Sequence, residues 1–156
     1  MIPSLSESRD SVRNPFYWVG LASYAVSYVL VAANDRELGV THLGYNCAVL
    51  SLVGPPALVG QILKGQPVHP YTDHILAGLS AVLCFFVNPA FFLFVFLQLV
   101  GAAKLATIYI RPLVLCLILV CWVFMFYSEW YPREGHIFWI LGMALVLYSS
   151  GPFKKA

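Results

Sequence analysis

The histidines are the residues of this chain best suited to chemistry, because imidazole binds metals and haem and carries protons near neutral pH. Three of them, His69, His74 and His136, stand in polar stretches between long apolar runs. Asp73 directly precedes His74. If the apolar runs cross a membrane in alternation, these four residues meet on one face. The set His69, Asp73, His74 and His136 is therefore a candidate haem or metal site.

The spacing of this set also has a simpler explanation. Polar residues are expected wherever an apolar run reaches water. Zinc and di-iron sites usually show tight helical spacings such as His-x-x-x-His or Glu-x-x-His, which are missing from this set. We therefore expect no protein-bound cofactor, and haem or metal at these histidines is the alternative.

A second candidate site consists of Lys104, Thr107 and Arg111. Their i, i+3 and i+7 spacing places them on one face of an α-helix. Two cations beside a hydroxyl could hold a phospholipid head group such as that of cardiolipin. The simpler explanation is that the two basic side chains reach from the end of a membrane span toward water.

The four cysteines lie within apolar runs and form no Cys-x-x-Cys pair; they are Cys47, Cys84, Cys116 and Cys121. A cysteine in apolar surroundings behaves as a small hydrophobic residue. We expect these side chains to serve packing, with redox or metal chemistry as the alternative.

The stretch 74–127 shows where these residues would be placed. It has only two charged residues, Lys104 and Arg111, and one helix of this length would measure roughly 80 Å at about 1.5 Å per residue. A bilayer core is about 30 Å thick, so the stretch would cross or re-enter a membrane more than once. Only 10% of the whole chain is charged, against about 25% in soluble domains.

The sequence therefore predicts an all-α, polytopic transmembrane helix bundle with about five spans. The expected spans are 16–33, 43–63, 74–103, 112–127 and 136–150. In domain terms, residues 1–15 form a polar N-terminal segment, 16–152 a single transmembrane helical domain, and 153–156 a short basic tail. Four or six segments, some of them re-entrant hairpins, are the alternative.

Prolines predict where these helices break. Asn88-Pro89 interrupts the third run, because proline removes a backbone donor and clashes with the preceding turn. Because the residue before proline avoids helix, we expect one helix to end near Tyr109 and the next to begin at Pro112.

Alternation of five spans puts the two chain ends on opposite sides of the membrane. The side that holds the C-terminus would carry five of the nine basic residues, which predicts that the C-terminus is inside and the N-terminus outside.

The composition favours packing over catalysis. The sequence has no phosphate-binding glycine loop and no Gly-x-Ser-x-Gly or His-Glu-x-x-His motif. We therefore expect a non-catalytic accessory subunit of a larger membrane complex, respiratory or photosynthetic in type, that binds other membrane subunits and phospholipid but no nucleic acid. The alternatives are a haem-, metal- or quinone-binding membrane protein and a small oligomeric transporter or lipid-handling protein. An organelle inner membrane, the mitochondrial one first, is the expected location, ahead of the endoplasmic reticulum, thylakoid or plasma membrane.

Overall fold

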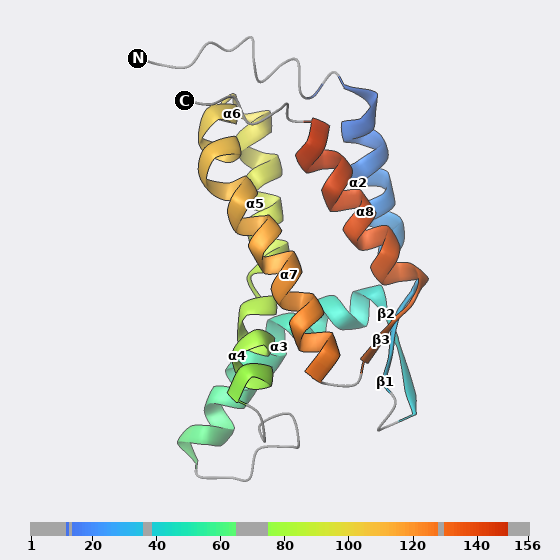
Figure 1. Ribbon diagram of the computed structural model, residues 1–156, viewed down its shortest axis with the longest axis vertical. Helices are drawn as coiled ribbons and strands as arrows, with labels where there is room; N and C mark the ends of the chain where they lie inside the picture. The colour runs from blue at the N-terminus through green and yellow to red at the C-terminus, as the bar shows by residue number, and fades with distance from the viewer. Residues whose placement is uncertain (1–11, 13, 36–38, 65–74, 128–129, 150–156) are drawn as a thin grey trace.

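The computed structural model describes residues 12, 14–35, 39–64, 75–127 and 130–149 of the chain. Figure 1 shows an elongated molecule in which α2 lies along α8, and α5 lies along α7. The helices are α2 (Pro15–Ser27), α3 (Gly44–Leu63), α4 (Ile75–Cys84), α5 (Val87–Leu99), α6 (Ala103–Leu105), the π-helix η2 (Ala106–Ile110), α7 (Arg111–Tyr127) and α8 (Glu134–Ser149). The strands are β1 (Val31–Asp35), β2 (Val40–Leu43) and β3 (Trp130–Pro132).

The prediction of an all-α bundle with about five spans, or with four or six, is wrong. The described residues are mostly helical, at 79%. In the described residues, however, only the segments Val82–Leu99 and Ala103–Phe126 are long and apolar enough to cross a membrane. At about 1.5 Å per residue, α2 and α8 measure roughly 20 and 24 Å, less than a bilayer core of about 30 Å. The chain also contains a small sheet.

The sheet replaces the ends of two expected helical elements. β1 pairs with β2 and β3, both antiparallel, in the order β2-β1-β3. The predicted helix through Ala33 instead ends at Ser27, and Val31–Asp35 runs extended. The N–H of Arg133 donates to the carbonyl of Ala32 at 2.9 Å, which ties the start of α8 to β1. Backbone pairing with two neighbours thus outweighed the apolar composition that suggested a helix.

The break in the third run precedes Asn88-Pro89. The helix is interrupted at Phe85 and Phe86, and α5 begins at Val87. Pro89 therefore lies in the first turn of α5, where the missing N–H leaves no intrahelical hydrogen bond unmade. Proline starts the second helix here, which explains why the break comes before it.

The helix end predicted near Tyr109 is also misplaced. The chain turns at Gly101, whose φ of 87° suits glycine, and the N–H of Ala102 donates to the carbonyl of Leu97 at 2.8 Å. Beyond that turn the helical stretch 103–127 continues through Pro112. The π-helix η2 ends at Ile110, two residues before Pro112, and the N–H of Arg111 donates to the carbonyl of Ala106. This wider turn lets the helix pass the proline without ending.

The backbones of α2 and α8 approach each other closely at two glycines. A Cβ atom on Gly142 would lie 2.5 Å from the nitrogen of Tyr24 and 2.7 Å from the oxygen of Gly20. A Cβ atom on Gly20 would lie 2.8 Å from the oxygen of Gly142. Only glycine allows helix backbones to approach so closely.

This contact also fixes the direction of the two helices. Gly20 near the start of α2 faces Gly142 and Val146, whereas Gly135 at the start of α8 lies against Val31. α2 and α8 are therefore antiparallel, and α2 begins at the end of the molecule where α8 finishes (Figure 1). The expected placement of the two chain ends on opposite sides does not fit this arrangement.

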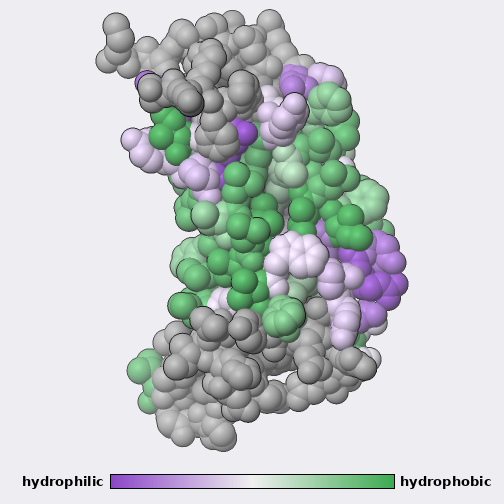
Figure 2. All heavy atoms as spheres, in the orientation of Figure 1, coloured by the Kyte–Doolittle hydropathy of each residue, from purple (hydrophilic) through white to green (hydrophobic). Residues whose placement is uncertain are grey.

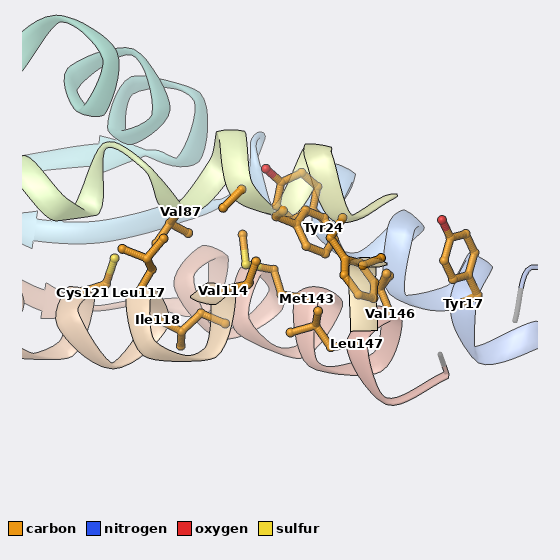
Figure 3. Packing of buried hydrophobic residues seen from close by; sticks show 14 residues of the cluster. Tyr17, Tyr24, Val87, Val114, Leu117, Ile118, Cys121, Met143, Val146 and Leu147 are labelled. Atoms are coloured by element: carbon orange, nitrogen blue, oxygen red, sulfur yellow. The ribbon is translucent and has the colours of Figure 1, made fainter. Parts of the chain in front are cut away.

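The buried core joins the two helix pairs. Figure 3 shows Tyr24 of α2, Val87 of α5, Val114 of α7, and Met143 and Val146 of α8 converging on one cluster. Val87, Val114, Met143 and Val146 are fully buried. The core thus joins side chains from α2, α5, α7 and α8 in one buried cluster.

The glycine contact gives a first prediction. Gly142→Ala would push a methyl group into the backbone of α2 and should lower the free energy of unfolding by at least about 1–3 kcal/mol, as overpacking does. The matched control is Gly60→Ala in α3, where a Cβ atom meets nothing within 4 Å. Thermal or denaturant unfolding in detergent measures both. Equal stability of the two variants would show that the glycine contact is not needed.

Candidate functional site

Asn88 is the centre of a polar network between three helices. Its Oδ1 accepts a hydrogen bond from the hydroxyl of Tyr24 at 2.9 Å and another from Nε1 of Trp139 at 3.1 Å. The hydroxyl of Tyr24 also lies 2.7 Å from that of Tyr28. One amide oxygen from α5 therefore connects α2 and α8, and both of its acceptor sites are used.

Aromatic rings enclose this network. The ring of Tyr24 lies 4.7 Å from that of Phe91, centroid to centroid. On α8, the ring of Trp139 stacks on His136 at 5.3 Å, and Trp122 of α7 meets His136 edge-on at 5.4 Å. The site therefore takes one or more aromatic or polar side chains from each of α2, α5, α7 and α8.

His136 is the one member of the predicted haem or metal set that the structure describes. It is buried, and its Nε2 has no hydrogen-bond partner within the described ranges. Burial lowers the pKa of His136 to about 4, so its imidazole is neutral at pH 7. His69, Asp73 and His74 lie outside the described residues. Within the described part of the chain, no three residues of the types His, Cys, Asp and Glu come together as a metal site would require.

The three residues of the second candidate site do not share one face of a regular α-helix in the structure. Lys104 is exposed, Thr107 is half-buried and Arg111 is buried. The π-helix η2 lies between Lys104 and Arg111 and changes the angle between them, because each of its residues turns the chain by less than an α-helical residue does. Phospholipid binding at Lys104, Thr107 and Arg111 stays a prediction.

The clearest charge pair in the described residues is at the start of α8. Nη2 of Arg133 lies 3.0 Å from Oε1 of Glu134, and both side chains are partly exposed to the surroundings. The hydrogen bond from Arg133 lowers the pKa of the Glu134 carboxyl. This pair marks the polar end of α8 next to the strands.

The sequence analysis missed the role of Asn88, which it treated only as a helix break. The signal for the helix pair was also present. Small buried residues recur every seven positions in α8, at Gly135, Gly142 and Ser149, and Gly20 and Ser27 in α2 share that spacing. Such a repeat places small residues along one seam, where helices approach closely.

The chain matches no protein-family model, no curated protein and no solved structure. The functional argument therefore depends on the geometry described above.

The network gives a second prediction. Asn88→Ala leaves the partly buried Nε1 of Trp139 without its acceptor and should lower the free energy of unfolding by about 1–3 kcal/mol. Trp139→Phe removes the donor, so the double variant should lose less than the sum of the single losses. Unfolding in detergent measures this double-mutant cycle. Asn46→Ala in α3 is the control, and strictly additive losses would contradict the proposed coupling.

The buried imidazole gives a third prediction. A histidine whose pKa is about 4 when folded and about 6.5 when unfolded binds a proton more readily in the unfolded chain. Its contribution to stability is therefore intact above pH 6.5 and is lost as the pH falls toward 4, by up to about 3 kcal/mol. Unfolding measured across this range should show the loss in the natural chain and a smaller one in His136→Phe. An unchanged pH dependence in the variant would exclude His136 as the cause.

Proposed function

We propose that this chain is an integral membrane protein in which the apolar segments Val82–Leu99 and Ala103–Phe126 form a membrane-crossing hairpin. The observation that carries the proposal is the exposure of large apolar side chains on these segments. Phe126 is 81% exposed, Leu119 66% and Phe96 57%. Surfaces of this kind mark contact with membranes or with other proteins.

The distribution of exposed residues supports a membrane rather than water around the hairpin. In Figure 2 apolar residues cover the middle of the visible face, and hydrophilic residues gather toward the strands and toward the end where α2 begins. Only 28% of the first segment and 33% of the second are buried. The core helix of a soluble protein would be mostly buried.

We further propose that the protein is a non-catalytic accessory subunit of a larger membrane complex, of the respiratory or photosynthetic type. Its exposed aromatic side chains, among them Phe92, Phe96 and Phe126, suit contact with neighbouring membrane helices. The polar groups of Asn88, Tyr24 and Trp139 hydrogen-bond one another, which suits a role in holding the helices together. The inner membrane of an organelle, first the mitochondrion, stays a prediction from the sequence, and cell fractionation tests it.

Phospholipid is the proposed small partner. Lys104 is exposed at the end of the hairpin, three residues after the turn at Gly101, a position suited to a lipid head group. Thr107 and Arg111 follow on the same helical stretch, so cardiolipin or another anionic lipid would be held at this end.

The proposal predicts that the protein stays in the membrane after alkaline carbonate washing and leaves it only with detergent. After extraction from native membranes in a mild detergent, it should co-purify with other membrane subunits and with phospholipid. Crosslinking followed by mass spectrometry and native mass spectrometry measure both. A stable monomer without partner chains would contradict the accessory-subunit role, whereas release by carbonate would contradict membrane integration.

Two comparisons sharpen this experiment. Lys104→Gln should reduce phospholipid bound to the purified protein and leave the partner chains in place, with Lys64→Gln, exposed at the end of α3, as the matched control. The absorption spectrum of the same sample tests the haem-, metal- or quinone-binding alternative. The observation that favours this alternative is the buried Nε2 of His136, which has no hydrogen-bond partner among the residues that the structure describes. A haem band or stoichiometric metal would replace the accessory role with that alternative.

A further inference from the structure

Two cysteines that are far apart in the sequence meet between α4 and α7. Cys84 is the last residue of α4, and Cys121 lies in α7. α4 packs along α7, which brings the thiols of Cys84 and Cys121 within interaction range of each other. Cys121 belongs to the buried core and Cys84 packs against that core from its edge. Figure 3 shows Cys121 at one end of the cluster, next to Leu117.

The surroundings of this pair limit what could react with it. Cys84 lies in the apolar segment Val82–Leu99 and Cys121 in the apolar segment Ala103–Phe126. Both are reduced in the structure. Cys84 is half-buried whereas Cys121 is buried, so an outside reagent meets Cys84 first. Because the proposed function places both segments in a membrane, on which this inference rests, a reagent that reaches the pair has to dissolve in an apolar phase.

We propose that Cys84 and Cys121 form a dithiol site that a lipid-soluble quinone oxidises to an intramolecular disulfide. This goes beyond the accessory role, which requires only packing from these residues. A quinone suits the site because it dissolves in apolar surroundings and accepts two electrons together with two protons.

The reaction balances in two steps. The Cys84 sulfur adds to a quinone carbonyl carbon, and its proton goes to the quinone oxygen. The Cys121 sulfur then attacks the Cys84 sulfur, so that the S–S bond forms, the C–S bond breaks, and its electron pair and the Cys121 proton leave with the quinol. Two thiols and one quinone give one disulfide and one quinol. A dithiol reductant reverses the product to two thiols by thiol–disulfide exchange.

The disulfide would also change the mechanics of the helices. Cys84 directly precedes the Phe85–Phe86 interruption, so a bond to Cys121 would fix the end of α4 on α7 across that interruption. The oxidised protein should therefore hold α4 more firmly than the reduced one.

The test uses the full chain in liposomes with Cys47→Ser and Cys116→Ser, which keeps only the pair. The probe is a fully substituted benzoquinone with a decyl tail, which cannot alkylate thiols at its ring carbons. We expect maleimide labelling after denaturation to show two free thiols before treatment and none after it, with one quinol formed per protein and two thiols again after a dithiol reductant. Thiols that stay free while quinone persists would overturn the proposal.

Matched variants separate the pair from general thiol chemistry. With Cys84→Ser or Cys121→Ser, quinol formation should disappear, whereas Cys116→Ser alone, at an exposed position on α7, should leave it unchanged. Circular dichroism checks that each variant remains helical, and Cys→Ala versions replace any that does not. If a water-soluble disulfide such as oxidised glutathione closes the bond and the quinone does not, the proposed quinone oxidant is wrong.

Discussion

The direct approach of α2 and α8 at Gly20 and Gly142 is the constraint on which the arrangement of the other helices depends. The two helices come from opposite ends of the sequence, so their contact brings the first and last labelled helices of the chain together. Because each glycine faces backbone of the other helix, the contact admits no larger residue on either side. It gains packing between backbones where side chains would hold the helices apart.

The asparagine network depends on this closure. Tyr24 follows Gly20 by four residues in α2, and Trp139 precedes Gly142 by three in α8, so the glycine seam brings both side chains beside α5. Asn88 can then accept from both at once. A single partly buried amide oxygen with two donors is fully used, which avoids the cost of an unsatisfied polar atom and fixes how α5 meets α2 and α8.

The positions of several helices could be predicted from the sequence, but which helices are long enough to form membrane spans could not. The apolar runs located α3, α7 and α8 to within a few residues, because hydropathy follows burial in either protein or lipid. Hydropathy does not distinguish a helix from a strand in a short run such as Val31–Ala33, where pairing with β2 and β3 decided the outcome. The rule for the residue before proline failed at Arg111, because the π-helix η2 precedes it. The candidate site was found only in part: His136 was named for its chemistry, whereas Asn88 and the small-residue seam act through position and size.

The buried and exposed side chains of this molecule differ more in size and shape than in polarity. On α8 the buried side includes Met143, Val146 and Leu147, while the outer side exposes Ile137, Phe138 and Leu141, which are as apolar. In water, burying one side of such a helix would lower the free energy about as much as burying the other side. In an apolar surrounding the choice has to come from close packing and from the few polar groups that pair, which here are glycine contacts and hydrogen bonds to Asn88. The features that hold this fold together are therefore those that operate when the hydrophobic effect between helices is weak, in agreement with the proposed membrane location.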